Sequence, residues 1–136
     1  MILNGRTAAS CRWAAGRVEA RGMTVVLIGA AGAAGVLARY GIGLLSQSMW
    51  ATFAINVVGS VLLGILLHAG RELAPEVRDA LGVGLLGGFT TFSTFSVRAV
   101  VESDSGAPGA AALYVIASVG FGLAAAAAGF YGARAL

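Results

Sequence analysis

The stretch that decides the fold is Gly87-Gly88-Phe89-Thr90-Thr91-Phe92-Ser93-Thr94-Phe95-Ser96, which lies inside a long apolar segment. A helix that faces lipid consists mainly of Leu, Ile, Val and Ala. These ten residues instead hold two adjacent glycines, five hydroxyl side chains and three phenylalanines. Glycine pairs weaken helices, and Thr and Ser offer the backbone alternative hydrogen bonds. We therefore predict a helix that is interrupted around residues 87–91.

A broken helix at membrane depth is tolerated only where protein buries it or water reaches it. The freed carbonyls can bind a cation, and the side chains can line a path. Phenylalanines spaced three apart usually form a packing stripe, but here they alternate with hydroxyls. Because an aromatic ring has a positive edge, ring edges and hydroxyls together can hold a dehydrated anion. Transport or conduction is therefore the first functional hypothesis.

The composition indicates a membrane protein. Of its 136 residues, 58% are hydrophobic and 11% are charged, whereas a soluble domain carries about 25% charge. A membrane span needs about 20 mostly apolar residues, so the chain has room for four spans and is too short to add a soluble enzyme domain. We predict an all-α membrane protein with antiparallel neighbouring spans at about residues 23–45, 50–69, 75–101 and 108–134, the third of them interrupted.

The net charge of +3 reflects the first 22 residues rather than a basic surface. All nine basic residues are arginines, and four of them precede Met23. No basic patch with interleaved aromatics follows, which argues against nucleic acid as a partner. The lone Cys11 supports neither a disulfide framework nor a metal site. We expect residues 1–22 to be a disordered or non-native extension of a channel domain over residues 23–136.

Several polar residues within the spans have two interpretations each. Asn56 is either an interhelical hydrogen-bonding residue or a donor that faces a pore. Arg39 either extends to the interface, as arginines near helix ends do, or attracts anions into a vestibule. Tyr114 and Ser118 share a helix face, either as a satisfied pair or as a polar track beside the phenylalanines. No carboxylate lies in the interior of a span, which argues against proton-coupled transport.

The run at residues 87–96 resembles the signature of the fluoride channel family, called Fluc or CrcB. The resemblance extends over residues 23–134 and includes two further patterns. Residues 32–40, Gly-Ala-Ala-Gly-Val-Leu-Ala-Arg-Tyr, match the first helix of the family, and residues 56–60, Asn-Val-Val-Gly-Ser, match the second. Residues 1–22 lie outside it.

The resemblance implies a dual-topology antiparallel homodimer in the inner or plasma membrane, surrounded by lipid, with two pores that export fluoride passively. It also implies a structural sodium ion held by backbone carbonyls at the dimer centre. By position, the carbonyls belong to Gly87 and Thr90, and Gly122 stands where some members continue the polar track with serine. The anion pathway would be formed by Asn56, Phe92, Ser93, Thr94, Phe95, Tyr114 and Ser118, with Arg39 in the vestibule.

Two other functions fit a small four-span protein. One is a dual-topology multidrug exporter, but such exporters use a membrane-embedded carboxylate that this chain lacks. The other is a non-conducting assembly subunit, which would explain the packing glycines but not the cluster at residues 87–96.

Overall fold

Four helical segments that are long and apolar enough to cross a membrane make up the chain, as predicted. The computed structural model describes residues 5–135, with side chains from Gly22 onward. The spans cover Gly22–Leu45, Met49–Glu72, Pro75–Asp104 and Pro108–Arg134. Their elements are α1 (Gly5–Leu45), α2 (Met49–Ala69), η1 (Gly70–Glu72), α3 (Pro75–Asp79), η2 (Ala80–Leu86), α4 (Gly87–Phe89), α5 (Phe92–Asp104) and α6 (Pro108–Arg134).

Local sequence signals set the ends of these helices. The Ser48 hydroxyl caps α2 by accepting a hydrogen bond from the Trp50 amide at 3.2 Å, which satisfies a free donor of the first turn. Pro75 and Pro108 occupy the first turns of α3 and α6, where a missing amide hydrogen costs nothing. The third span runs to Asp104, three residues beyond the predicted end at residue 101, and the turn follows at Gly106 with φ 92°.

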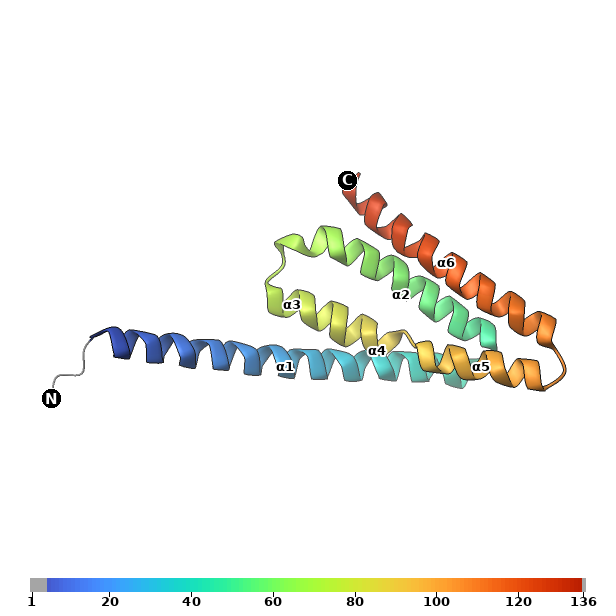
Figure 1. Ribbon diagram of the computed structural model, residues 1–136, viewed down its shortest axis with the longest axis horizontal. Coiled ribbons are helices and arrows are strands. Elements are labelled where there is room, and N and C mark those ends of the chain that lie inside the picture. The colour runs from blue at the N-terminus through green and yellow to red at the C-terminus, as the bar shows by residue number, and fades with distance from the viewer. Residues whose placement is uncertain (1–4, 136) are drawn as a thin grey trace.

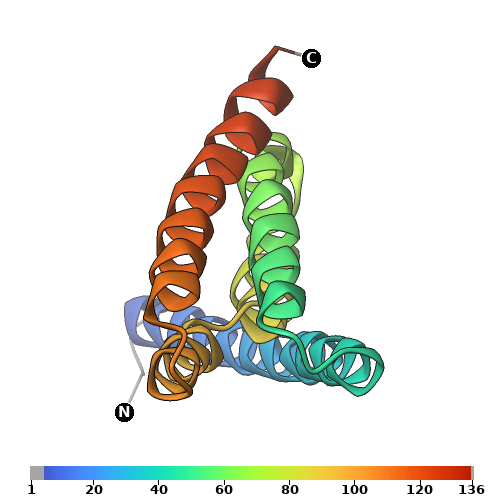
Figure 2. The same cartoon turned by 90° about the vertical axis from the view of Figure 1, so that its right-hand side faces the viewer.

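The helices associate as two pairs (Figure 1): α1 lies along α3, η2 and α4 of the third span, and α2 lies along α6. Figure 2 shows that the α2–α6 pair rises at an angle from α1 and α5. The turns at residues 46–48 and 105–107, which each connect one pair to the other, lie at the same end of the bundle (Figure 1). Neighbouring spans are therefore antiparallel, as predicted.

Glycines allow the backbones of α1 and the third span to meet. A Cβ atom on Gly35 would collide with the carbonyl oxygen of Leu85, and one on Gly88 would lie 2.6 Å from the carbonyl oxygen of Gly32. Small residues permit such close approach in lipid, where packing rather than hydrophobicity drives association. Gly29, one turn before Gly32, has nothing within 4 Å of an added Cβ in the single chain.

Glycines also allow the backbones of α2 and α6 to meet. A Cβ atom on Gly64 would collide with the carbonyl oxygen of Ala126, and one on Gly129 with that of Val61. An added Cβ on Gly132, three residues further along α6, would have nothing within 4 Å. The close crossing is therefore centred on Gly129 and loosens toward the end of α6.

Most large apolar side chains of the described residues are exposed in the single chain. Val26, Leu37, Val83, Ile116 and Leu123 are each 65–70% exposed. In a multi-pass cell membrane protein, such a surface faces lipid or another protein copy. The buried apolar residues are few, and they are Ile55, Ala80, Leu86, Phe95, Ala111, Tyr114 and Ala125.

The expected extension at residues 1–22 lies at the beginning of α1. The helix is drawn from Gly5, residues 1–4 lie outside the described part, and so do the side chains before Gly22. Whether these residues are a disordered or non-native extension stays a prediction.

Candidate functional site

The third span is interrupted between α4, which ends at Phe89, and α5, which begins at Phe92. The two intervening threonines have extended backbones, with φ −80° and ψ 158° at Thr90 and φ −153° and ψ 119° at Thr91. The interruption thus lies at one end of the predicted range, 87–91. Gly87 and Gly88 are themselves helical, so the glycine pair does not form the break. At Gly88 the absence of a side chain serves the close approach to Gly32 described above.

The Asn56 side chain on α2 clamps this break from across the bundle. Its Oδ1 atom accepts a hydrogen bond from the Thr91 amide at 2.9 Å, and its Nδ2 atom donates to the Thr91 carbonyl oxygen at 3.1 Å. One amide side chain therefore satisfies both backbone groups of a residue in an extended conformation. The interhelical role of Asn56 is present in the structure. The second Nδ2 hydrogen is a donor that this pair does not use, and its role toward an anion stays a prediction.

The break takes the helical amide partners away from the carbonyls at the end of α4 and from that of Thr90. In an unbroken helix, the Gly87 carbonyl would accept from the Thr91 amide and the Thr90 carbonyl from the Thr94 amide. The Thr91 amide instead donates to Asn56, and the Thr94 amide donates to the Thr91 hydroxyl at 3.2 Å. By contrast, the Gly88 carbonyl accepts from Arg39 Nε at 3.2 Å. The Thr91 and Thr94 amides, which would be the helical partners of the Gly87 and Thr90 carbonyls, thus donate to side chains instead.

The hydroxyls of the motif mostly stabilise the break and the helix that follows it. Thr91 Oγ1 lies 3.1 Å from Thr94 Oγ1 and 3.3 Å from Ser93 Oγ. The Thr91 hydroxyl caps α5 because it accepts from the Thr94 amide. Thr90 Oγ1 donates back to the Leu86 carbonyl at 2.9 Å. Ser93 is exposed and Thr94 is half-buried, so both predicted pathway residues lie next to the break.

Three aromatic rings lie in sequence beside the start of α5. The ring centroids of Phe92 and Phe95 are 5.6 Å apart, and those of Phe95 and Tyr114 are 5.2 Å apart. Phe95 is buried, whereas Phe92 is 78% exposed in the single chain. The rings of Phe95 and Tyr114 thus bring α5 and α6 together, while Phe92 faces away from the bundle.

Tyr114 and Ser118 are neighbours on α6, as predicted, but they are not a hydrogen-bonded pair. Tyr114 is completely buried, and its hydroxyl neighbours the side chains of Thr52 and Ser118. Within the described residues, neither the Tyr114 hydroxyl nor the Ser118 hydroxyl has a hydrogen-bond partner. Buried hydroxyls normally find a partner, and an unpaired one calls for an explanation. A track that receives a ligand or water is one such explanation.

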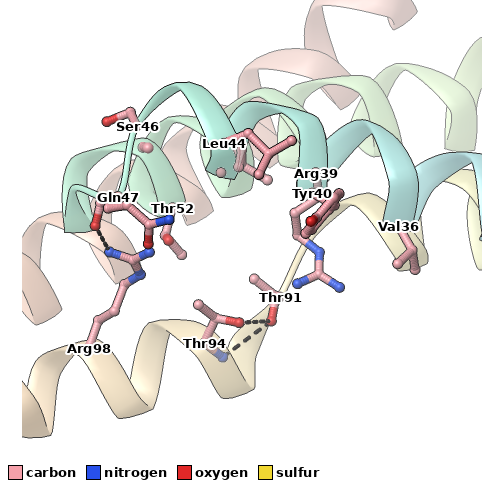
Figure 3. Close-up of a pocket in the computed structure, with 13 residues that line it drawn as sticks. Val36, Arg39, Tyr40, Leu44, Ser46, Gln47, Thr52, Thr91, Thr94 and Arg98 are labelled. Carbon is pink, nitrogen blue, oxygen red and sulfur yellow. Dashed lines mark hydrogen bonds between the residues drawn. The ribbon is translucent and has the colours of Figure 1, made fainter.

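A cavity of about 300 Å³ opens between the end of α1, the start of α2 and the first turns of α5 (Figure 3). The Arg39 guanidinium points into it near Thr91, and Arg98 reaches across from α5 to donate a hydrogen bond to the Gln47 carbonyl (Figure 3). Of the described residues that line it, none is acidic. We call it the arginine cavity, and its main polar lining consists of Arg39, Gln47, Thr52, Thr91, Thr94 and Arg98.

The structure divides the predicted site residues into two groups joined through α5. One group surrounds the break, and the other lines the α5–α6 contact. A smaller cavity of about 140 Å³ adjoins the break on its α2 side and is lined by Asn56, Ser60, Gly87 and Thr90 among others. Sequence reasoning counted Arg98 only as a charge, because nothing in its spacing shows that it reaches the α1–α2 turn. The break group contains Asn56, Gly87, Thr90, Ser93, Thr94 and Arg39, and the aromatic group contains Phe92, Phe95, Tyr114 and Ser118.

Comparison with known proteins gives one consistent result. Residues 26–130 match the family described as CrcB-like protein, Camphor Resistance. A fluoride-specific ion channel of Rhodospirillum centenum is 46% identical over 103 residues, which cover 69% of this chain and 82% of the relative. One from Symbiobacterium thermophilum is 46% identical over 114 residues, covering 76% and 92%. One from Thermus thermophilus is 41% identical over 106 residues, covering 72% and 85%.

Proposed function

This chain belongs to the CrcB-like family of fluoride-specific ion channels, and we propose that it lets fluoride leave the cytoplasm passively, lowering fluoride toxicity. The observation that carries the proposal is the interrupted third span, with unpartnered carbonyls on one side and aromatic rings and free hydroxyls on the other. Relatives are named as ion channels rather than enzymes. A proton-coupled drug exporter would need an acid in the membrane, and no Asp or Glu lies between residues 23 and 71 or between 105 and 136.

The anion would travel along the second group of residues. An anion that has lost water needs several weak donors. The edges of Phe92 and Phe95 and the unpartnered hydroxyls of Tyr114 and Ser118 are such donors, and they lie beside one another. Asn56, Ser93 and Thr94 would supply donors where the pathway meets the break, and Arg39 would attract the anion to the arginine cavity.

A sodium ion would be a structural partner of the break rather than a transported ion. Carbonyl oxygens freed from a helix suit a hard monovalent cation. Gly87 and Thr90 fit this role because their carbonyls have lost their helical amides, while the carbonyls of Gly88 and Thr91 are occupied by Arg39 and Asn56. The charge of the ion would attract the carbonyl oxygens at the break and so stabilise the interruption in the folded state.

A second copy of this chain, inserted in the opposite direction, would complete the channel as an antiparallel homodimer. Three residues of the proposed site, Gly87, Phe92 and Ser93, are exposed in the single chain, so a partner is needed to enclose them. Membrane orientation follows Lys and Arg near the span ends. From Met23 onward, one side has three arginines and the other has two, Arg39 and Arg98. This near balance favours insertion in both directions, whereas the four arginines before Met23 would oppose it.

We expect purified protein in liposomes to release trapped fluoride when a potassium ionophore balances the charge, and to retain trapped chloride. Ion-selective electrodes would follow both anions. Labelled sodium in the same vesicles should stay inside, because a structural cation has no stoichiometric flux. Equal release of chloride, or no release of fluoride, would overturn the channel proposal, and sodium release in proportion to fluoride would overturn the structural cation alone.

Replacing Phe95 with isoleucine is expected to reduce fluoride flux by about tenfold, the effect of roughly 1.4 kcal/mol on the barrier. Isoleucine keeps an apolar side chain in the buried site but removes the positive ring edge. Flux would be measured per assembled dimer, with Phe53→Ile as control, because the Phe53 ring makes edge contacts with Trp50 and Phe121 and none with Phe92, Phe95 or Tyr114 among the described ring pairs. Wild-type flux in Phe95→Ile would assign this ring to packing.

A further inference from the structure

Arg98 is the second positive charge of the arginine cavity, and no role has been given to it so far. It lies on α5, two residues after the motif ends at Ser96, and its guanidinium hydrogen-bonds the Gln47 carbonyl in the α1–α2 turn. The bond fixes a long, flexible side chain across the cavity, facing the end of α1 that carries Arg39 (Figure 3). Two guanidinium groups thus line one cavity of about 300 Å³.

The charges of both arginines are uncompensated there. Each guanidinium bonds a neutral carbonyl oxygen, Gly88 for Arg39 and Gln47 for Arg98. Glu102 follows one turn later on α5, yet among the described residues no ion pair joins it to Arg98, and it does not line the cavity. Charged groups in a concave, low-dielectric surrounding focus their field and raise the local concentration of counter-ions.

Arg98 also connects the cavity to the proposed pathway. The first helical turn of α5 carries Thr94 and Phe95, and Thr94 lines the cavity while Phe95 contacts Tyr114. Arg98 follows Thr94 by four residues on the same face of α5. Thr52, which lines the cavity from α2, neighbours the Tyr114 hydroxyl. An anion in the cavity is therefore held close to the unpartnered hydroxyls of α6.

We propose that Arg98 sets the anion-attracting potential of the arginine cavity and thereby raises the rate at which small monovalent anions reach the pathway. This inference rests on the proposed channel function for the identity of the anion, but the potential itself is independent of transport. The alternative is that Arg98 only ties α5 to the α1–α2 turn. The proposal requires the charge of Arg98, whereas the alternative requires only its hydrogen bond to the Gln47 carbonyl.

The potential can be measured directly at Ser46, an exposed residue that lines the cavity. In a Cys11→Ser background, Ser46→Cys would be modified with thiol reagents of equal size, one bearing a sulfonate and the other a trimethylammonium group. Losing a unit charge at a partly screened distance should lower the anionic rate about threefold and raise the cationic rate by about as much. Arg98→Gln should thus shift the rate ratio about tenfold.

Two controls separate charge from architecture. Arg98→Lys keeps the charge without the guanidinium fork, so its rate ratio should stay within about twofold of wild type. Salt at about 1 M, where the Debye length is roughly 3 Å, should abolish the Arg98→Gln effect. An unchanged ratio in Arg98→Gln, or the same shift in Arg98→Lys, would overturn the proposal.

Fluoride flux gives the functional arm. Arg98→Gln should raise the fluoride concentration for half-maximal flux about threefold at low salt, and the difference should vanish at high salt. A loss of flux that is equal at all salt concentrations would instead indicate that Arg98 only holds α5 against the α1–α2 turn. If wild-type protein shows the charge-dependent labelling but no fluoride flux, the cavity potential stands and the proposed channel function fails.

Discussion

Replacing Asn56 with leucine should lower fluoride flux by about thirtyfold, because two hydrogen bonds worth about 1 kcal/mol each hold Thr91 in its extended conformation. Leucine is close to asparagine in size, but it removes both hydrogen bonds to Thr91 and leaves the Thr91 amide without its partner. The Thr91 amide is then free to donate to the Gly87 carbonyl again, which would restore the helix across the break. Restoring it would also remove one ligand of the proposed sodium ion.

This prediction is measured as fluoride efflux per reconstituted dimer, with protein integrity followed by size-exclusion chromatography in detergent. Val58→Leu is the matched control, because Val58 lies two residues further along α2 and is 51% exposed. Sodium should stabilise the wild-type protein against heat but not Asn56→Leu. Retention of wild-type flux in Asn56→Leu would show that the break forms without the clamp.

Removing the Tyr114 hydroxyl should weaken conduction without weakening the fold. The hydroxyl is buried and has no hydrogen-bond partner among the described residues, and an unpaired buried hydroxyl costs about 1–3 kcal/mol. Tyr114→Phe should therefore be as stable as wild type or more so. If the hydroxyl donates to the passing anion, a bond worth about 1.5–3 kcal/mol is lost, and flux falls about tenfold to a hundredfold.

Flux and thermal midpoint would be measured on the same preparations. Tyr131→Phe is the control, since Tyr131 is 63% exposed near the end of α6 and should change neither quantity. A lower midpoint in Tyr114→Phe would mean that the hydroxyl is satisfied in the assembled protein. Unchanged flux would place the anion elsewhere.

Much of the fold follows from composition and local chemistry. Every end of the four spans agrees with the prediction to within about three residues. The agreement is close because the length of an apolar segment and the positions of Pro and Gly are local properties. The break at Thr90–Thr91 lies within a cluster of residues that compete with helical hydrogen bonds. The resemblance to the fluoride channel family is carried first by the same stretch, and the family match extends over residues 26–130.

The hydrogen-bond partners of the polar side chains could not be predicted from local sequence patterns. Sequence left Asn56 with two interpretations, and only the packing of α2 against the third span shows that it clamps Thr91. The glycine pair was interpreted as the break, whereas in the structure Gly88 makes room for Gly32. The position of a glycine in the sequence does not show whether it allows an unusual backbone conformation or the close approach of a neighbouring helix.

By itself, the sequence determined a four-span membrane protein of the fluoride channel family with an interruption in its third span. Those properties depend on apolar length, hydroxyl and glycine content, and the order of a motif, which are present in the chain before it folds. Only the tertiary structure decided which carbonyls lose their helical amides, that the Tyr114 hydroxyl is buried without a partner, and that Arg98 joins Arg39 at one cavity. These depend on contacts such as Asn56–Thr91, Gln47–Arg98 and Thr52–Tyr114, between residues 35 to 62 positions apart, which exist only once the helices have packed.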